Sequence, residues 1–170
     1  MEQQLSLIST RVIRNRIKRE LEKFINDNLC TKEEINITPI IENNHNTIQG
    51  YDIEIQNIKD NKHYCFTISS NYPFRPPKLR INYKPIRFYH MTNNNKFRSD
   101  LKKYTGIECF CCETILCANN WSPGLTLKHV INDIDKFINA FRQVIDRIIV
   151  DVIKRKYFFN DINIIEWLYI

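Results

Sequence analysis

The sequence predicts an α+β fold in which a helix precedes an antiparallel sheet and further helices follow it. Three observations support this order: apolar residues at helical spacing near the N-terminus, short strand-like runs between residues 35 and 83, and a longer helical pattern after residue 126. Neither an internal repeat nor a linker rich in Pro, Gly and Ser divides the chain. One compact domain over residues 1–170 is therefore expected.

The first helix is expected from Ser9 to Asp27, with Ser9 or Thr10 as its N-cap. Basic residues occupy the face opposite an apolar stripe. The stripe consists of Val12, Ile13, Ile17, Leu21, Phe24 and Ile25.

Four runs rich in β-branched and aromatic residues follow, and they predict strands. These runs are Ile35–Ile41, Thr47–Ile58, His63–Ser69 and Leu79–Tyr83. In the third, buried-type and polar-type positions alternate with the period of two that a half-buried strand shows. Short polar segments at 42–44 and 59–62 separate the first three runs, so a four-stranded antiparallel meander is predicted.

Residues 84–120 show no sustained periodicity, and long irregular stretches of this kind are usually functional or disordered. Two hypotheses apply to 91–108: a mobile basic flap, or a short docked helix, because Phe97, Leu101 and Tyr104 are spaced by four and three. From Leu127 to Ile153, apolar spacing predicts one long helix or two joined helices. A short terminal helix containing Trp167 is also expected.

Composition excludes several classes of protein. With 43% hydrophobic residues in 170, the chain is able to form a core without disulfides or metal. The net charge of +6 comes from basic residues mixed with acidic ones, so no nucleic-acid partner is expected. The sequence contains neither an apolar segment of about 20 residues nor a secretory signal. We therefore expect no membrane partner, a cytoplasmic or nuclear location, and six reduced cysteines.

Two motifs resemble those of ubiquitin-conjugating (E2) enzymes. Residues 71–81 read NYPFRPPKLRI, which is similar to the family's YPFxPP signature, and residues 112–131 read CETILCANNWSPGLTLKHVI. The second motif resembles the segment in which a catalytic cysteine precedes an Ile-Leu pair, then Trp-Ser-Pro, then a helix. The resemblance extends from about Ser9 to Phe141, and it implies the family's fold. From about 142 the chain departs from the family, and a divergent helical extension is expected there.

The resemblance implies that Cys112 accepts ubiquitin or a ubiquitin-like protein as a thioester from an E1 activating enzyme, and passes it to a substrate lysine or an E3 ligase. Cys112 lies three residues before Ile115-Leu116, as the family's alignment requires, if one extra residue lies between Leu116 and Trp121. Cys111 is the alternative acceptor, and Cys109 is further out of register. No cofactor or metal is implied.

The family's His-Pro-Asn triplet corresponds here to His90, Met91 and Thr92. By resemblance, His90 supports the site structurally, and Asn93, one residue late, supplies the oxyanion-stabilising amide if the loop is re-registered. Trp121 is expected to anchor the core beside the site. Thr114 stands where many members carry an acidic residue.

By the same resemblance, an E3 ligase would contact Phe74, Ser122 and Pro123 together with the basic face of the first helix. The altered His-Pro-Asn triplet leaves an alternative open. In that alternative, the chain is a catalytically inactive E2-like module that binds ubiquitin or E3 partners.

A zinc site formed by Cys109, Cys111, Cys112 and Cys117, with His129 or His90, is the competing interpretation of the cysteines. Their spacing lacks the paired C-x2-C knuckles of structural zinc sites. Adjacent cysteines also rarely bind the same tetrahedral ion. The sequence therefore favours the thioester interpretation over the zinc site.

Overall fold

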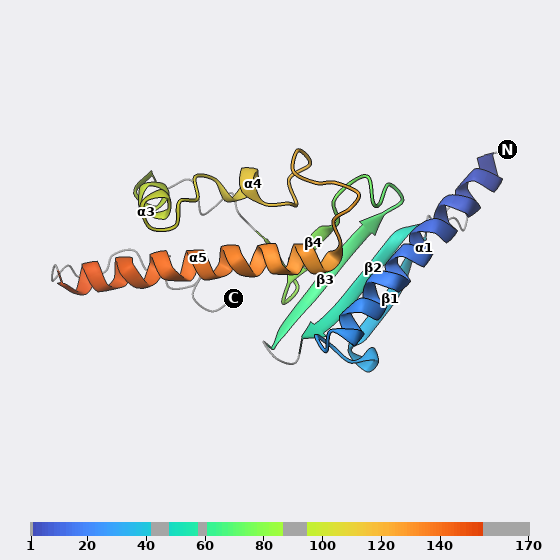
Figure 1. Cartoon of the computed structure of the whole chain (residues 1–170), viewed down its shortest axis with the longest axis horizontal. Coiled ribbons are helices and arrows are strands. Elements are labelled where there is room, and N and C mark those ends of the chain that lie inside the picture. The colour runs from blue at the N-terminus through green and yellow to red at the C-terminus, as the bar shows by residue number, and fades with distance from the viewer. Residues whose placement is uncertain (1, 42–47, 58–60, 87–94, 155–170) are drawn as a thin grey trace. The chain divides into compact units, whose positions relative to one another are not determined.

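A computed structural model describes residues 2–41, 48–57, 61–86 and 95–154 (Figure 1). The expected α+β class is confirmed, with helices before and after an antiparallel sheet. The chain divides into two compact units that are interleaved in sequence. The first consists of residues 1–86 and 115–130, and the second of residues 87–114 and 131–170.

Helix α1 of the first unit spans Glu2–Asn26. It runs through Ser9 and Thr10, so the prediction that either residue caps its N-terminus is wrong. Most of the predicted apolar stripe is buried, but Val12 is 58% exposed. Because successive residues are rotated by about 100° around a helix, Val12 lies to the side of the stripe that begins at Ile13. A short 3-10 helix, Lys32–Glu34, then leads into the sheet.

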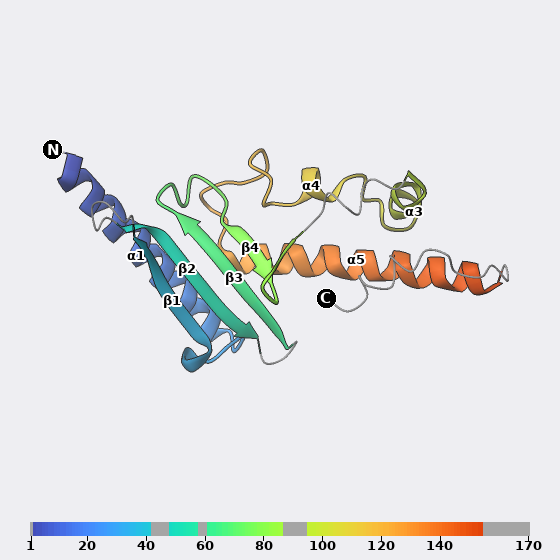
Figure 2. The same ribbon diagram turned by 180° about the vertical axis from the view of Figure 1, so that it is seen from behind.

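The sheet contains five antiparallel strands in sequential order. They are β1 Ile35–Ile41, β2 Ile48–Asn57, β3 Lys62–Ser69, β4 Lys78–Ile81 and β5 Lys84–Pro85. Figures 1 and 2 show β1 to β4 from opposite sides. The first four agree with the predicted strands to within a few residues at their ends. The predicted number of four is wrong, because the short edge strand β5 pairs with β4.

Strand β5 arises from a tight turn where the sequence predicted continued strand. Asn82 and Tyr83 have φ angles of 49° and 63°, the left-handed conformation of a two-residue hairpin turn. Asn82 is fixed there by His63 of β3, whose amide donates to the Asn82 side-chain oxygen at 2.9 Å. The Tyr83 ring stacks on His63 with centroids 4.5 Å apart. Pro85 suits the edge position because an edge strand leaves amides unpaired.

One face of the sheet carries the core of the first unit. Tyr64, Phe66 and Ile68 of β3 are completely buried. In register they face Ile55, Ile53 and Tyr51 of β2, and Ile81 and Leu79 of β4 lie opposite Tyr64 and Phe66. Cross-strand pairs of aromatic and β-branched residues stabilise a sheet, and their burial provides most of the driving force for folding. Helix α1 adjoins the first two strands, where Ile17 and Leu21 line a groove together with Ile37 and Tyr51.

A buried carboxylate links three separate segments of the first unit. Glu20 of α1 is only 8% exposed. Its oxygens accept hydrogen bonds from the Tyr72 hydroxyl at 2.7 and 2.9 Å and from the Leu127 amide at 2.9 Å. Arg16, one turn earlier, donates to Glu20 at 2.8 Å and to the Leu125 carbonyl at 2.8 Å. The negative charge is thus paired and hydrogen-bonded, which is the condition under which a buried carboxylate is tolerated.

The second unit has its own core. Helix α3 spans Asn95–Thr105, α4 spans Phe110–Glu113, and α5 spans Leu127–Lys154, beginning in the first unit. The core residues are Phe97, Leu101, Ile107, Phe110, Phe137, Val144 and Ile145. Over residues 95–105 the docked-helix hypothesis is therefore confirmed and the mobile-flap hypothesis is wrong. Phe97 and Leu101 bury enough apolar surface to order the segment.

Helix α5 is a single helix, which settles the choice between one helix and two. It continues past Phe141, the expected limit of the family resemblance. The expected terminal helix around Trp167 lies outside the described residues. Within the described part of the chain, every helix is too short or too polar to span a bilayer.

Replacing Tyr72 with Phe tests the buried hydrogen-bond network. The loss of a hydrogen bond to a charged group should lower the free energy of unfolding by about 1.5–3 kcal/mol at pH 7. Burial, and then the neighbouring Glu20, raise the pKa of Tyr72 in the folded state. Its stabilising contribution is therefore fully present below about pH 10 and is lost as the pH rises above that value.

Urea unfolding at several pH values measures both effects. The difference in stability between the wild type and Tyr72→Phe should shrink above about pH 10, because only the wild type loses this contribution. Tyr83→Phe, at an exposed position, is the matched control and should follow the wild type. If the difference in stability between the wild type and Tyr72→Phe stayed constant above about pH 10, the hydrogen bond from Tyr72 to Glu20 would be contradicted.

Candidate functional site

The predicted acceptor, Cys112, lies on α4, a four-residue helix held in place on both sides. Phe110 is 1% exposed and packs edge-on against Phe137 of α5, with ring centroids 5.2 Å apart. After the helix, the buried Thr114 donates its hydroxyl hydrogen to Asp133 of α5 at 2.8 Å. These contacts fix α4 to α5 within the second unit.

The backbone before α4 is held by a side chain of the helix itself. Oε1 of Glu113 accepts the amide hydrogens of Glu108 at 2.6 Å and Cys109 at 3.2 Å. A carboxylate that satisfies amides at the start of a helix stabilises that end. The position of the cysteines therefore depends on Glu113, whose role the sequence analysis did not anticipate.

Three of the predicted thiols converge at α4. The Cys109 and Cys111 sulfurs are 2.9 Å apart, and the Cys111 and Cys112 sulfurs are 3.7 Å apart. Cys109 and Cys111 are partly buried, whereas Cys112 is exposed. Cys117 belongs to the first unit. The structure thus gives the competing acceptor candidates clearly different accessibility.

The two partly buried thiols perturb each other. The hydrogen bond from Cys111 is the main cause that lowers the pKa of Cys109. The same bond is the main cause that raises the pKa of Cys111, to about 12. Of these two thiols, Cys109 is therefore the one that loses its proton at the lower pH. A reactive sulfur has to be both ionised and reachable, and Cys109 is the less reachable of the two outer thiols.

The predicted partner residues lie in two connected loops of the first unit. Trp121 is buried, and its indole nitrogen donates to the Pro73 carbonyl at 2.6 Å. This bond joins the proline-rich loop that contains Phe74 to the loop that contains Ser122 and Pro123. Both loops are also tied to α1, because Tyr72 and Leu127 bind Glu20.

The predicted partner side chains of these two loops face solvent. Phe74 is 78% exposed, so it is not a lid of the core, and Ser122 and Pro123 are exposed as well. Gly124, which follows Pro123, lines a cavity of about 290 Å³ between α1 and the segment before α5. Four of the lining residues are basic: Arg16, Arg19, Lys23 and Lys128. The exposed Phe74 ring is suited to an apolar groove of a partner, and a basic hollow is suited to acidic groups.

Two predicted site residues cannot be placed. His90 and Asn93 lie outside the described residues, as do Met91 and Thr92, so the oxyanion hypothesis stays a prediction. The roles of Glu20, Glu113 and Asp133 were not predicted from the sequence. Glu20 occurs where the basic face of α1 meets its apolar stripe, and that position at the edge of the stripe was the only available signal.

Replacing Trp121 with Phe tests the bond between the two loops. The change leaves the Pro73 carbonyl without its donor, so the free energy of unfolding should fall by about 1–3 kcal/mol. Denaturant unfolding followed by circular dichroism measures it. Phe74→Leu, at an exposed position in the same loop, should change stability by no more than about 0.5 kcal/mol. Equal stability of Trp121→Phe and the wild type would show that the indole bond does not hold the loops together.

Comparison of the chain with protein families, with curated proteins and with solved structures found no match. Function is therefore inferred from the motifs of this sequence and from the geometry of the residues just described.

Proposed function

We propose that the chain is a divergent ubiquitin-conjugating enzyme that carries ubiquitin or a ubiquitin-like protein as a thioester on Cys112. The observation that supports this most is accessibility. All six cysteines lie in the described part of the chain, and of these six Cys112 alone is exposed. A thiol that accepts a protein-sized acyl group from one enzyme and yields it to another has to be reachable from solvent. The cysteine chosen by sequence position is also the most accessible.

The proposed chemistry consists of two acyl transfers. The Cys112 thiolate attacks the carbonyl carbon of the E1 thioester, forming a new carbon–sulfur bond while the E1 thiolate leaves. A lysine amine then attacks the Cys112 thioester, forming the amide bond, expelling the Cys112 thiolate and losing a proton. Transfer to an E3 cysteine would repeat the first type of step. Neither step requires a metal or cofactor.

The proposed partner surface supports the same function. Phe74 would insert into an apolar groove of an E3 ligase, with Ser122 and Pro123 beside it. The basic hollow, in which Arg19 and Lys23 lie beside the ion-paired Arg16 and Lys128, would attract acidic residues of the E1 or E3 enzyme. Cytoplasm and nucleus are the compartments where these partners and reduced thiols would coexist.

An inactive E2-like binding module is the second candidate. The observation that favours it is the replacement of the family's Pro and Asn by Met91 and Thr92 after His90. In such a module the partner surface would operate alone, and Cys112 would not be charged. The two candidates therefore differ in one measurable property, the formation of a thioester.

Incubation with E1, ATP and ubiquitin or a ubiquitin-like protein should produce an adduct that reducing agent removes, because thiols cleave thioesters but not isopeptide bonds. Cys112→Ala should abolish it. Cys112→Ser should give a slower oxyester that resists thiols, since an alkoxide is the poorer leaving group. Non-reducing and reducing gels distinguish these species.

Cys117→Ser is the matched control for charging and should retain the adduct, and Cys111→Ser tests the alternative acceptor. Loss of the adduct in Cys111→Ser but not in Cys112→Ala would move the acceptor to Cys111. If folded wild-type protein fails to charge with each modifier and its competent E1, the binding module becomes the better assignment.

Replacing Phe74 with Ala should separate partner binding from folding. Because the ring is 78% exposed, the free energy of unfolding should change by no more than about 0.5 kcal/mol. Truncation of an apolar anchor typically weakens binding by about 2 kcal/mol or more, which corresponds to roughly thirtyfold. E3-dependent discharge of the Cys112 thioester, compared with E3-independent discharge, measures the effect. A selective defect is expected; an unfolded variant or unchanged E3-dependent discharge would contradict the partner surface.

A further inference from the structure

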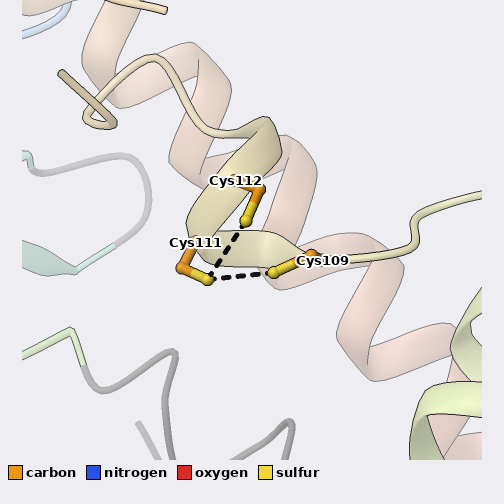
Figure 3. Close-up of side chains that lie close together, drawn as sticks. All are labelled: Cys109, Cys111 and Cys112. Carbon is orange, nitrogen blue, oxygen red and sulfur yellow. Dashed lines mark hydrogen bonds between the residues drawn. The ribbon is translucent and has the colours of Figure 1, made fainter. Parts of the chain in front are cut away.

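Three sulfur atoms meet on the surface of α4, as Figure 3 shows for Cys109, Cys111 and Cys112. All three lie within 4.8 Å of one another. Acyl transfer requires one thiol, so the proposed function does not account for two more beside it.

The sulfurs are held by a rigid local frame. Phe110, between Cys109 and Cys111 in sequence, is buried in the core of the second unit. Glu113 fixes the backbone of Cys109, and Thr114 ties the end of α4 to Asp133. With the backbone anchored on both sides, ordering three ligands around one ion costs less conformational entropy than in a flexible loop.

We propose that Cys109, Cys111 and Cys112 bind a Zn²⁺ ion through three thiolates, with a fourth position open to solvent. Thiolates favour soft and borderline ions such as Zn²⁺ over Mg²⁺ and Ca²⁺, which require oxygen ligands. Three protein ligands with one open position is a known arrangement for this ion. The exposure of Cys112 leaves room for water at that position.

The distances are compatible with one ion. Zinc–sulfur bonds of about 2.3 Å in a tetrahedral arrangement put sulfurs about 3.8 Å apart. The Cys111–Cys112 separation of 3.7 Å already matches this value, so these adjacent cysteines do present their sulfurs to one point. The Cys109–Cys111 separation of 2.9 Å would have to widen by about 0.9 Å on binding, by rotation of the side chains about their χ1 bonds.

This site differs from the zinc site that the sequence spacing opposed. That site required four cysteines, including Cys117, and a structural zinc site of this kind normally uses paired C-x2-C knuckles. A three-thiolate site needs only the C-x-C-C segment. Cys109 is the N-cap residue of α4, and Cys111 and Cys112 lie in its single turn, so the three sulfurs come close together. The missing C-x2-C pairs therefore do not exclude a three-thiolate site.

Zinc binding has a consequence that rests on the proposed function. The ion would occupy the Cys112 sulfur that attacks the E1 thioester, so bound Zn²⁺ would inhibit charging and a chelator would restore it. Bound Zn²⁺ would then switch off the charging of Cys112 with ubiquitin or a ubiquitin-like protein. The binding test below uses no E1 or ubiquitin, so failure of either proposal is recognised separately.

The test is titration of the full reduced chain with Co²⁺, followed by displacement with Zn²⁺, under a phosphine reductant that keeps the thiols from forming disulfides. One ion per chain should bind and give sulfur-to-cobalt charge-transfer absorption. Cys109→Ser, Cys111→Ser and Cys112→Ser should each weaken binding by at least about 10–100-fold, the loss typical even of an outer-shell change. Circular dichroism checks that each variant is folded.

Two controls locate the ion. Cys117→Ser should bind as the wild type does. His63→Ala removes a ligand from a second group, formed with Glu54 and Cys65, whose donor atoms also lie within 4.8 Å of one another, and it too should leave binding unchanged. Absence of charge-transfer absorption, unchanged affinity in the Cys109 and Cys111 variants, or loss of binding in His63→Ala would overturn the proposed site.

Discussion

The Glu20 carboxylate is the interaction on which the first unit depends, because it binds α1, the proline-rich loop and the start of α5 together. A buried charge is unfavourable unless it is paired and hydrogen-bonded, and Arg16, Tyr72 and the Leu127 amide provide those partners. The amide belongs to the first turn of α5, where negative charge is favourable. The geometry of the exposed loops therefore follows from one buried group.

This constraint also explains the arrangement of the proposed partner surface. Tyr72 immediately precedes Pro73, whose carbonyl accepts the Trp121 indole hydrogen, and Arg16 binds the Leu125 carbonyl. Phe74 and Ser122 are thus displayed from loops whose bases are fixed by buried polar bonds. A surface that is ordered before binding loses less entropy when a partner docks. The residues that a partner would contact can therefore be exposed and still be held in position by the buried bonds.

Most of the sheet could be predicted because its pattern is local. Tyr64, Phe66 and Ile68 occupy every second position, and this alternation predicts both the strand and its buried face. The turn at Asn82 and Tyr83 could not be predicted, because neither residue is glycine and their left-handed conformation depends on His63, which is distant in sequence. The burial of Glu20 could not be predicted either, because a glutamate on a basic helix is typical of a surface position. Its burial depends on Tyr72, which is distant in sequence. At α4 the sequence identified the thiols, but their convergence depends on the helical turn and on Glu113.

The clustering of thiols bears directly on the choice of acceptor. Thioester exchange between neighbouring cysteines is nearly neutral in free energy, so an acyl group on Cys112 could pass to Cys111, whose sulfur is 3.7 Å away. Accessibility then decides which cysteine is productive, because both the incoming E1 thioester and the outgoing lysine have to reach the sulfur from solvent. The hydrogen bond to Cys109 is the main cause that raises the pKa of Cys111, and a thiol with a raised pKa forms less of the nucleophilic thiolate. The exposure of Cys112 therefore favours it as the acceptor over Cys111, although the three sulfurs are chemically alike.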